Sequence, residues 1–257
     1  MIDLYILGSG SNGNCTVVKS SKFKYPVMVD YGISHMQEKL LLCGLKPENI
    51  AWQVYTHSHG DHYKPNNYLD NMFPEDLTGG SKNFYLGCSP AIHDAKGLNQ
   101  NIFLSDGNLS FYYRCDSPFY NMKEEGKYLE DADIIFSECN YSAPAHQTDV
   151  IDGHPVDHIY PEDLKKRVRE TGHMSNEHYV DFMTDIDDLY GLKNKYLIIG
   201  HISNTYNSIK TIERDVIPNL PRHKGHFIVD PTYCPYLVHV TRKKVTTRSL
   251  INERSNV

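Results

Sequence analysis

Short apolar runs separated by polar turns recur along the whole chain. Runs of three to five apolar residues bounded by Gly, Pro, Asn, Asp or Ser are typical of buried β-strands. The turn at residues 105–108, Ser-Asp-Gly-Asn, joins two such runs and predicts a β-hairpin. The strands predicted in this way cover residues 4–7, 15–18, 27–29, 51–55, 84–86, 101–104, 109–113, 134–136, 195–199, 226–229 and 236–240.

Longer segments with an apolar period near 3.6 residues predict helices between these strands. Ser34 and Gln37 match a capping box at the start of the first one, and Ser175 matches the N-cap of the third. The predicted helices cover residues 34–42, 161–172, 175–186 and 209–216. The third carries an i, i+3, i+4, i+7 stripe that should face a core, made of Tyr179, Phe182, Met183 and Ile186. Strands interleaved with helices indicate an α/β protein, in which functional side chains gather at strand ends.

Length and charge narrow the functional classes. A chain of 257 residues with no marked linker is expected to form one domain over residues 1–257. A net charge of −6 argues against extensive sequence-independent binding of nucleic acid, although a local basic patch stays open. Four basic residues on the second predicted helix form either that patch or a solvated face: Lys165, Lys166, Arg167 and Arg169.

The six cysteines are scattered and contain no Cys-x-x-Cys pair, which favours reduced, mostly buried thiols. The N-terminus has no basic start followed by an apolar run, and no segment approaches the length of a membrane span. We therefore expect a soluble, cytoplasmic protein that does not contact membranes. The C-terminal basic tail after Val240 is expected to fray.

The strongest chemical signal follows the predicted strand at residues 51–55. The segment Thr56-His57-Ser58-His59-Gly60-Asp61-His62 offers four metal-binding side chains, and Gly60 is expected to provide a sharp turn. Alternate residues of an extended segment point the same way, so His57 and His59 can share one ion while Asp61 and His62 turn toward a second. Two metal ions are therefore expected.

Other polar residues also close predicted strands. Asp30 follows the strand at 27–29, where we expect it to hold the histidine loop through hydrogen bonds rather than bind metal directly; an ordinary turn aspartate is the alternative. Asp116 and Glu138 end two further strands, and His201 ends another. The glycine-rich loop at residues 8–14 permits close backbone approach, but no helix pattern or Lys-Ser/Thr follows it, so a phosphate-binding P-loop is not expected.

The order of these motifs resembles the metallo-β-lactamase fold superfamily, and within it the phosphodiesterase branch. Asp30, the histidine loop, His93, Asp116 and His201 match the superfamily's five metal-site motifs in sequence. The loop at 8–14, Glu138-Cys139-Asn140 and Gly172-His173-Met174-Ser175-Asn176-Glu177 are similar to motifs of the YycJ/WalJ-like bacterial exonucleases. tRNase Z and the phage anti-Pycsar cyclic-nucleotide phosphodiesterases share this catalytic apparatus.

The resemblance implies a four-layer αββα sandwich and a dinuclear site holding two divalent ions, Zn²⁺ or Mn²⁺. His57, His59 and His93 would bind one ion, Asp61, His62 and His201 the other, and Asp116 would bridge them. A hydroxide shared by the ions would attack phosphorus. His173, paired with Glu138, would protonate the leaving group; capping of the following helix is its alternative role.

The implied activity is hydrolysis of phosphodiester bonds in a nucleotide substrate, either a cyclic mononucleotide or a DNA or RNA end. The interval from His62 to His93 looks shortened relative to the exonucleases, and Tyr141-Ser142 replaces their His-Asp, with an insertion at 143–155. Two other classes stay open: a thioesterase or lactamase using the same metal site, and a non-catalytic nucleotide-binding protein. The branch often pairs into homodimers, which the 19 tyrosines would suit.

Overall fold

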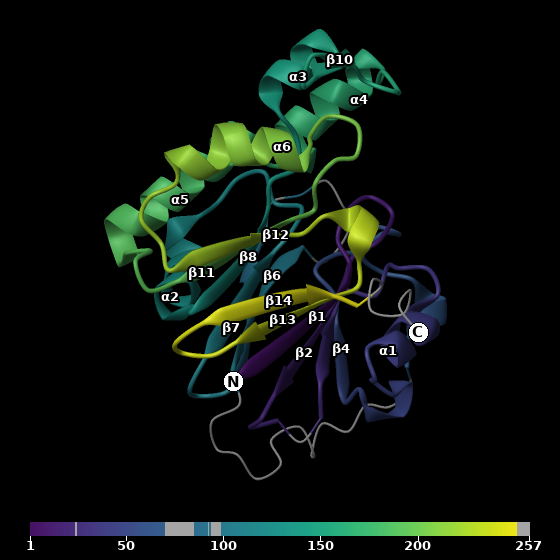
Figure 1. Ribbon diagram of the computed structural model, residues 1–257, viewed down its shortest axis with the longest axis vertical. Helices are drawn as coiled ribbons and strands as arrows, with labels where there is room; N and C mark the ends of the chain where they lie inside the picture. Colours follow the sequence, from purple (N-terminus) through teal and green to yellow (C-terminus); the bar gives the residue numbers. More distant parts are fainter. Residues whose placement is uncertain (24, 70–84, 92, 94–98, 251–257) are drawn as a thin grey trace.

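The structure, a computed structural model, describes residues 1–23, 25–69, 85–91, 93 and 99–250 (Figure 1). The polar, turn-rich sequence of residues 63–82 predicts a surface or substrate-facing loop, and most of it lies outside the described residues, as does residue 84 of one predicted strand. Asp94 and Ala95, which flank His93 on its C-terminal side, are likewise outside them.

The described residues form two six-stranded sheets and a short two-stranded ribbon. The first sheet has the order β14(Val245–Ser249), β13(Tyr236–Val240), β1(Ile2–Gly8), β2(Cys15–Ser20), β3(Val27–Val29), β4(Trp52–Val54). The second has the order β12(Gly225–Ile228), β11(Tyr196–Gly200), β8(Ile134–Glu138), β7(Ser110–Arg114), β6(Gln100–Ser105), β5(Tyr85–Pro90). The ribbon pairs β9(Val150–Ile151) with β10(His154–Pro155).

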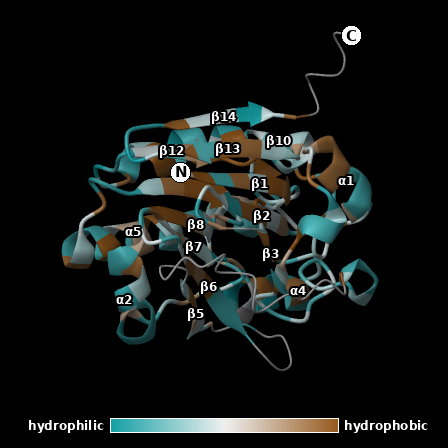
Figure 2. Ribbon diagram, turned by 90° about the horizontal axis from the view of Figure 1, so that it is seen from below, coloured by the Kyte–Doolittle hydropathy of each residue, from teal (hydrophilic) through white to brown (hydrophobic). Residues whose placement is uncertain are grey.

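The two sheets pack face to face because side chains alternate along each strand. In β1, Ile2, Leu4 and Ile6 point into the core between the sheets, while Tyr5 and Leu7 point to the opposite face of the first sheet. In Figure 2 the brown colour that marks hydrophobic residues is concentrated in the central strands. Each sheet therefore has a second apolar face that must be covered by another layer.

Helices provide that cover. Helix α1(Met36–Leu42) packs on the outer face of the first sheet, and α2(Met122–Asp131) and α5(Asn176–Tyr190) pack on the outer face of the second. All four residues of the predicted apolar stripe on α5 are fully buried. The expected four-layer α/β sandwich is confirmed (Figure 1). None of the described helices combines the length and hydropathy that a bilayer crossing requires.

The remaining helical segments are short. Helices α3(Ala143–Thr148) and α4(Glu162–Arg167) gather with β10 at one end of the molecule (Figure 1). Residues Val168–Gly172 continue α4 as one π-helical segment, and α6(Ile209–Thr211) continues into another, Ile212–Val216. Single 3-10 turns cover Pro47–Asn49, Pro65–Asn67, Ile217–Asn219 and Pro231–Tyr233.

The structure corrects several expectations. Helix α1 has His35 at its N-cap with no side-chain cap hydrogen bond, so the capping box of Ser34 and Gln37 is wrong. Helices α2 and α3 were not predicted, and the tail expected to fray contains β14, which pairs with β13. The expected reduced thiols are confirmed, since all six cysteines are free and four of them are buried.

Strand direction places the polar residues at one edge of the sandwich. Strands β3 and β4 run parallel, as do β7, β8, β11 and β12. Asp30, Asp116 and His201 follow three of these strands, and each adopts a left-handed backbone, with φ of 56°, 50° and 49°. Non-glycine residues rarely adopt this conformation, and such strain concentrates at functional sites.

Candidate metal centre

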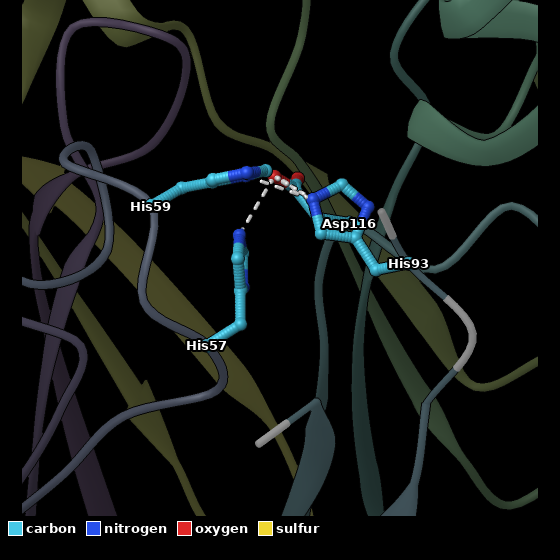
Figure 3. Close-up of side chains that lie close together, drawn as sticks. All are labelled: His57, His59, His93 and Asp116. Atoms are coloured by element: carbon cyan, nitrogen blue, oxygen red, sulfur yellow. Dashed lines mark hydrogen bonds and ion pairs between the residues drawn. The ribbon is translucent and has the colours of Figure 1, made fainter. Parts of the chain in front are cut away.

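The histidine loop and the second sheet meet around one carboxylate. His57 and His59 come from the loop after β4, whereas His93 and Asp116 come from the β5–β6 connection and the end of β7. One potential ligand atom from each of these four residues lies within 4.8 Å of the others. Figure 3 shows the three imidazoles converging on Asp116. This is a ligand set of suitable type and spacing for one divalent ion.

Asp116 also lies beside a second group of side chains, which includes His62 and His201. Asp116 Oδ2 lies 3.5 Å from His57 Nε2 and 3.8 Å from His93 Nε2 of the first group, and 3.2 Å from His62 Nε2 of the second. Its Oδ1 lies 3.1 Å from His201 Nδ1. Asp116 therefore stands between two clusters of imidazoles.

Asp61 lies beside the second cluster. Its Oδ2 is 3.6 Å from His62 Nε2 and 3.6 Å from His201 Nε2. The structure thus brings together all seven residues that the resemblance implied as metal ligands. It also adds Cys115, whose sulfur lies among His62, Asp116 and His201. Burial, followed by the proximity of Asp116 and Glu138, raises the pKa of the Cys115 thiol well above its usual value.

Hydrogen bonds orient the loop histidines. His62 Nδ1 donates to Asp30 Oδ2 over 2.7 Å, and both side chains are fully buried. Asp30 Oδ1 also accepts from the backbone N–H and the hydroxyl of Thr56, at 2.8 and 3.0 Å. Thr56 Oγ1 lies 3.0 Å from His57 Nδ1. The Nδ1 atoms of both histidines are thereby engaged, which leaves each Nε2 to face Asp116.

His201 is held from two directions that sequence reasoning did not assign. Its backbone N–H donates to Ser9 Oγ over 2.8 Å, and Asn140 Nδ2 donates to its carbonyl oxygen over 2.8 Å. Asn140 Nδ2 also lies 3.0 Å from His201 Nδ1. The Ser9 contact spans 192 positions of sequence and the Asn140 contact 61. No local pattern could have indicated either contact.

The electrostatics fit a cation better than an empty polar cluster. Burial, followed by the proximity of His62, lowers the pKa of His57 to about 2, so His57 is the neutral imidazole that metals bind. Among the described residues, neither His57 Nε2 nor His201 Nε2 has a hydrogen-bond partner, although both atoms are buried. Each instead faces a carboxylate oxygen at 3.5 or 3.6 Å. Buried imidazole nitrogens left in this way are costly unless an ion occupies the space between.

His173 and Glu138 form a pair at the edge of this centre. His173 Nδ1 donates to Glu138 Oε2 over 3.0 Å and lies 3.4 Å from Asp116 Oδ1. Glu138 is fully buried and also accepts from the Ser117 backbone N–H, whereas the His173 side chain is 21% exposed. Burial acts to lower the pKa of His173, but Asp116 and Glu138 outweigh it and raise the pKa well above its ordinary value.

Glycine permits the loop to sit against the first sheet. A Cβ on Gly32 would lie 1.9 Å from the backbone carbon of Asp61, so only glycine fits there. Asn14, from the glycine-rich loop, donates its backbone N–H to the Asp61 carbonyl. Gly60 is different: its φ is not positive and a Cβ would meet nothing within 4 Å. The expected turn is present, since the His62 backbone N–H donates to the His59 carbonyl over 2.9 Å, but it does not require glycine.

A cavity of about 340 Å³ opens onto the centre, a size at the small end of the range for ligand pockets. Asp61, Asp116 and His173 line it from the metal side. Arg167 and Val168, at the junction of α4 and its π-helical continuation, also line it.

The four basic residues of α4 and its π-helical continuation lie in different environments. Lys165 is buried and its Nζ lies 2.7 Å from Asp149 Oδ1, so it belongs to neither a solvated face nor an anion patch. Lys166 is exposed and lies 3.9 Å from Glu170, while Arg169 contacts His146 at 3.4 Å. Only the position of Arg167 agrees with the anion-patch alternative.

Comparison with known proteins agrees with this architecture. No family model matches the chain. The exodeoxyribonuclease WalJ of Streptococcus pneumoniae, in strains D39 and R6, is 26% identical over 248 residues, covering 83% of this chain and 86% of WalJ.

Solved structures extend the likeness to the fold. The metallo-beta-lactamase fold protein YhfI from Bacillus subtilis superposes with a TM-score of 0.59 at 16% identity, covering 90% of this chain and 96% of YhfI. Human tRNase Z, short form, superposes with a TM-score of 0.56 at 12% identity, covering 79% of this chain and 93% of that structure. The layered fold and these likenesses together show that the chain has the metallo-β-lactamase fold.

Proposed function

We propose that this protein is a metal-dependent phosphodiesterase that hydrolyses nucleotide substrates. The observation that carries the proposal is the position of Asp116 beside the cavity, where its Oδ2 faces His57, His93 and His62 and its Oδ1 faces His201, so that one carboxylate contacts both groups of imidazoles. A structural metal site needs four closed ligands and no cavity. Seven potential ligands beside an open cavity suit a catalytic pair of ions instead.

In this proposal His57, His59 and His93 hold one divalent ion, Asp61, His62 and His201 hold the other, and Asp116 bridges them. Zn²⁺ and Mn²⁺ both suit imidazole and carboxylate donors. When bound, such ions would neutralise phosphate oxygens and lower the pKa of water for attack on phosphorus. Asp30 fixes the orientation of the His62 ring by accepting its Nδ1 proton.

His173 would donate a proton to the departing alkoxide. Its Nδ1 is held by Glu138 Oε2 at 3.0 Å, and it is the exposed member of the pair, so its other nitrogen can face a substrate in the cavity. Glu138 would act by holding Nδ1, since it is buried away from the cavity side of the imidazole. Thioester or lactam hydrolysis at the seven ligands would not need the pair of His173 and Glu138. The presence of the pair therefore favours hydrolysis of a phosphodiester, whose departing alkoxide needs a proton.

Two of the similar proteins are named for nucleic-acid processing, an exodeoxyribonuclease and a tRNase, and this supports a nucleotide or nucleic-acid end as substrate. Cyclic mononucleotides stay in the test because the small cavity would admit them. The homodimer implied by the resemblance also stays a prediction, which light scattering at micromolar concentration would check.

The deciding experiment incubates protein loaded with Zn²⁺ or Mn²⁺ with bis(p-nitrophenyl) phosphate, DNA, RNA and a cyclic-nucleotide panel. We expect metal-dependent hydrolysis that Asp61→Ala abolishes and that the exposed α5 control Asp188→Ala retains. Hydrolysis of a thioester with no phosphodiester turnover would support the thioesterase alternative. Stoichiometric nucleotide binding without product would support a non-catalytic role.

A further inference from the structure

Arg167 is the one lysine or arginine among the described residues that line the metal-site cavity. The other lining groups near the metals are carboxylates and imidazoles, including Asp61, Asp116 and His173. With both ions bound, the inner end of the cavity carries positive charge for a scissile phosphate. Arg167 adds a second cationic position in the lining of the same cavity.

The side chain belongs to a segment that is anchored away from the cavity. Lys165, two residues earlier, is buried against Asp149, which also accepts from the Tyr206 hydroxyl at 2.8 Å. Arg169, two residues later, reaches the buried His146. These contacts fix the rotation of α4 so that Arg167 lies on the cavity side.

The same segment leads directly to the proposed proton donor. The π-helical turn Val168–Gly172 separates Arg167 from His173, and the His173 backbone N–H donates to the Val168 carbonyl over 2.9 Å. A Cβ on Gly172 would lie 3.3 Å from the Arg167 carbonyl, so the turn is closely packed. π-Helical turns of this kind are frequent at functional sites. Arg167 and His173 are thus positioned relative to each other by a short, continuous helical segment.

On the basis of the proposed function, we infer that Arg167 binds the phosphate next to the scissile one, so that the substrate is a polynucleotide end. In the proposed function the metal ions and His173 would serve the scissile group, whereas Arg167 is an exposed residue in the cavity lining. A guanidinium forms bidentate hydrogen bonds to phosphate oxygens in a fixed fork. The small cavity suits one nucleotide inside, with the continuing strand crossing the rim. A cyclic mononucleotide has no second phosphate for this site.

The test compares substrates with one phosphate and with several. Thymidylyl-thymidine and bis(p-nitrophenyl) phosphate each carry only the scissile group, while a single-stranded thymidylate decamer carries neighbouring phosphates. For Arg167→Ala we expect kcat/KM on the decamer to fall about 10- to 100-fold, mainly through KM, as for loss of a charge-assisted hydrogen bond. The single-phosphate substrates should change less than about 2-fold. The slope of log KM against log salt should decrease by about 0.7, the value for one single-strand phosphate contact.

Lys166→Ala is the matched control, because Lys166 is an exposed neighbour on the same helix that does not line the cavity. Arg167→Lys should recover part of the decamer activity, since it keeps the charge and loses the fork. Equal losses on decamer and single-phosphate substrates, or no loss on either, would overturn the inference. A wild-type preference for cyclic mononucleotides over the decamer would overturn it too.

Failure of the proposed function gives a different result, in which the wild type cleaves none of these substrates. Fluorescence anisotropy of a labelled decamer with metal-loaded protein then decides the inference separately. Weaker binding by Arg167→Ala than by Lys166→Ala would support the phosphate contact. Equal binding by the two variants would contradict the inferred contact between Arg167 and a phosphate.

Discussion

His173 is the side chain whose role can be isolated most cleanly by choice of leaving group. Its imidazolium is held by Glu138 at 3.0 Å and lines the cavity. We expect His173→Ala to reduce kcat on a nucleotide substrate about 10²- to 10⁴-fold, the usual contribution of a general acid. Cleavage of bis(p-nitrophenyl) phosphate should fall far less, because p-nitrophenolate departs without a proton. A helix-capping role would instead lower the melting temperature and affect both substrates alike.

Some residues of the site could be predicted from the sequence, and others could not. The histidine loop indicated metal binding by itself, since four ligands stand within six residues. His93, Asp116 and His201 entered only through the resemblance, and Ser9 and Asn140 were not assigned at all. Their contacts with His201 depend on how two sheets pack, which no local pattern encodes. Arg167 was one of four equivalent basic residues until the fold separated them.

At the scale of elements, the histidine loop depends on close packing against the segment after β3. Gly32→Ala would force a Cβ to within 1.9 Å of the Asp61 backbone, so the loop must shift. We expect this variant to lose metal, measured by elemental analysis after dialysis, and to lose at least about 2 kcal/mol of unfolding free energy in urea. Gly60→Ala is the control in the same loop, where a Cβ has open space and stability should change by less than about 1 kcal/mol. Equal behaviour of the two variants would contradict the packing argument.

The α3–α4 end carries a buried histidine that should make stability depend on acid. His146 packs between Tyr141 and Tyr206, and its Nε2 has no hydrogen-bond partner among the described residues. Burial, then Arg169 and Lys165, lowers its pKa to about 4, with smaller opposing effects from Asp149 and Glu162. In the folded state His146 therefore binds a proton only near pH 4, whereas in the unfolded state it binds one near pH 6.5. Its contribution to stability is constant above that pH and falls as pH drops from about 6.5 to 4.

Urea denaturation at several pH values would measure this effect. His146→Phe keeps a buried ring without a titrating group, so it should show a shallower loss of stability than wild type between pH 6.5 and 4. His178→Phe, at an exposed position of α5, should keep the wild-type slope. Identical slopes for wild type and His146→Phe would show that His146 does not titrate in this way.

Elements were predictable where apolar runs alone defined them. The strands β3 and β13 were located to the residue, because each is a continuous run between polar turns. Helix α2 was missed because its inward face contains a charge: Glu125 is buried and accepts from Arg114 and Tyr112, both from β7. That pairing comes from tertiary structure, and the sequence of α2 is polar overall although Tyr128 and Leu129 give it an apolar face.

For the whole molecule, the candidate centre joins the two sheets. His57 and His62 follow β4 of the first sheet, while Asp116 and His201 follow β7 and β11 of the second. Ions that bind only the folded chain must therefore stabilise the whole sandwich, by about 2.7 kcal/mol at 100 times the dissociation constant and about 4.1 kcal/mol at 1,000 times. We expect the melting temperature to fall when a chelator removes metal and to recover when Zn²⁺ or Mn²⁺ is restored. His201→Gln, which removes a ligand from the second sheet, should lose most of that response, whereas the exposed control Asp188→Ala should keep it. If chelated and metal-loaded wild type melt at the same temperature, the side chains around Asp116 do not hold ions between the sheets, and the proposed chemistry loses its basis.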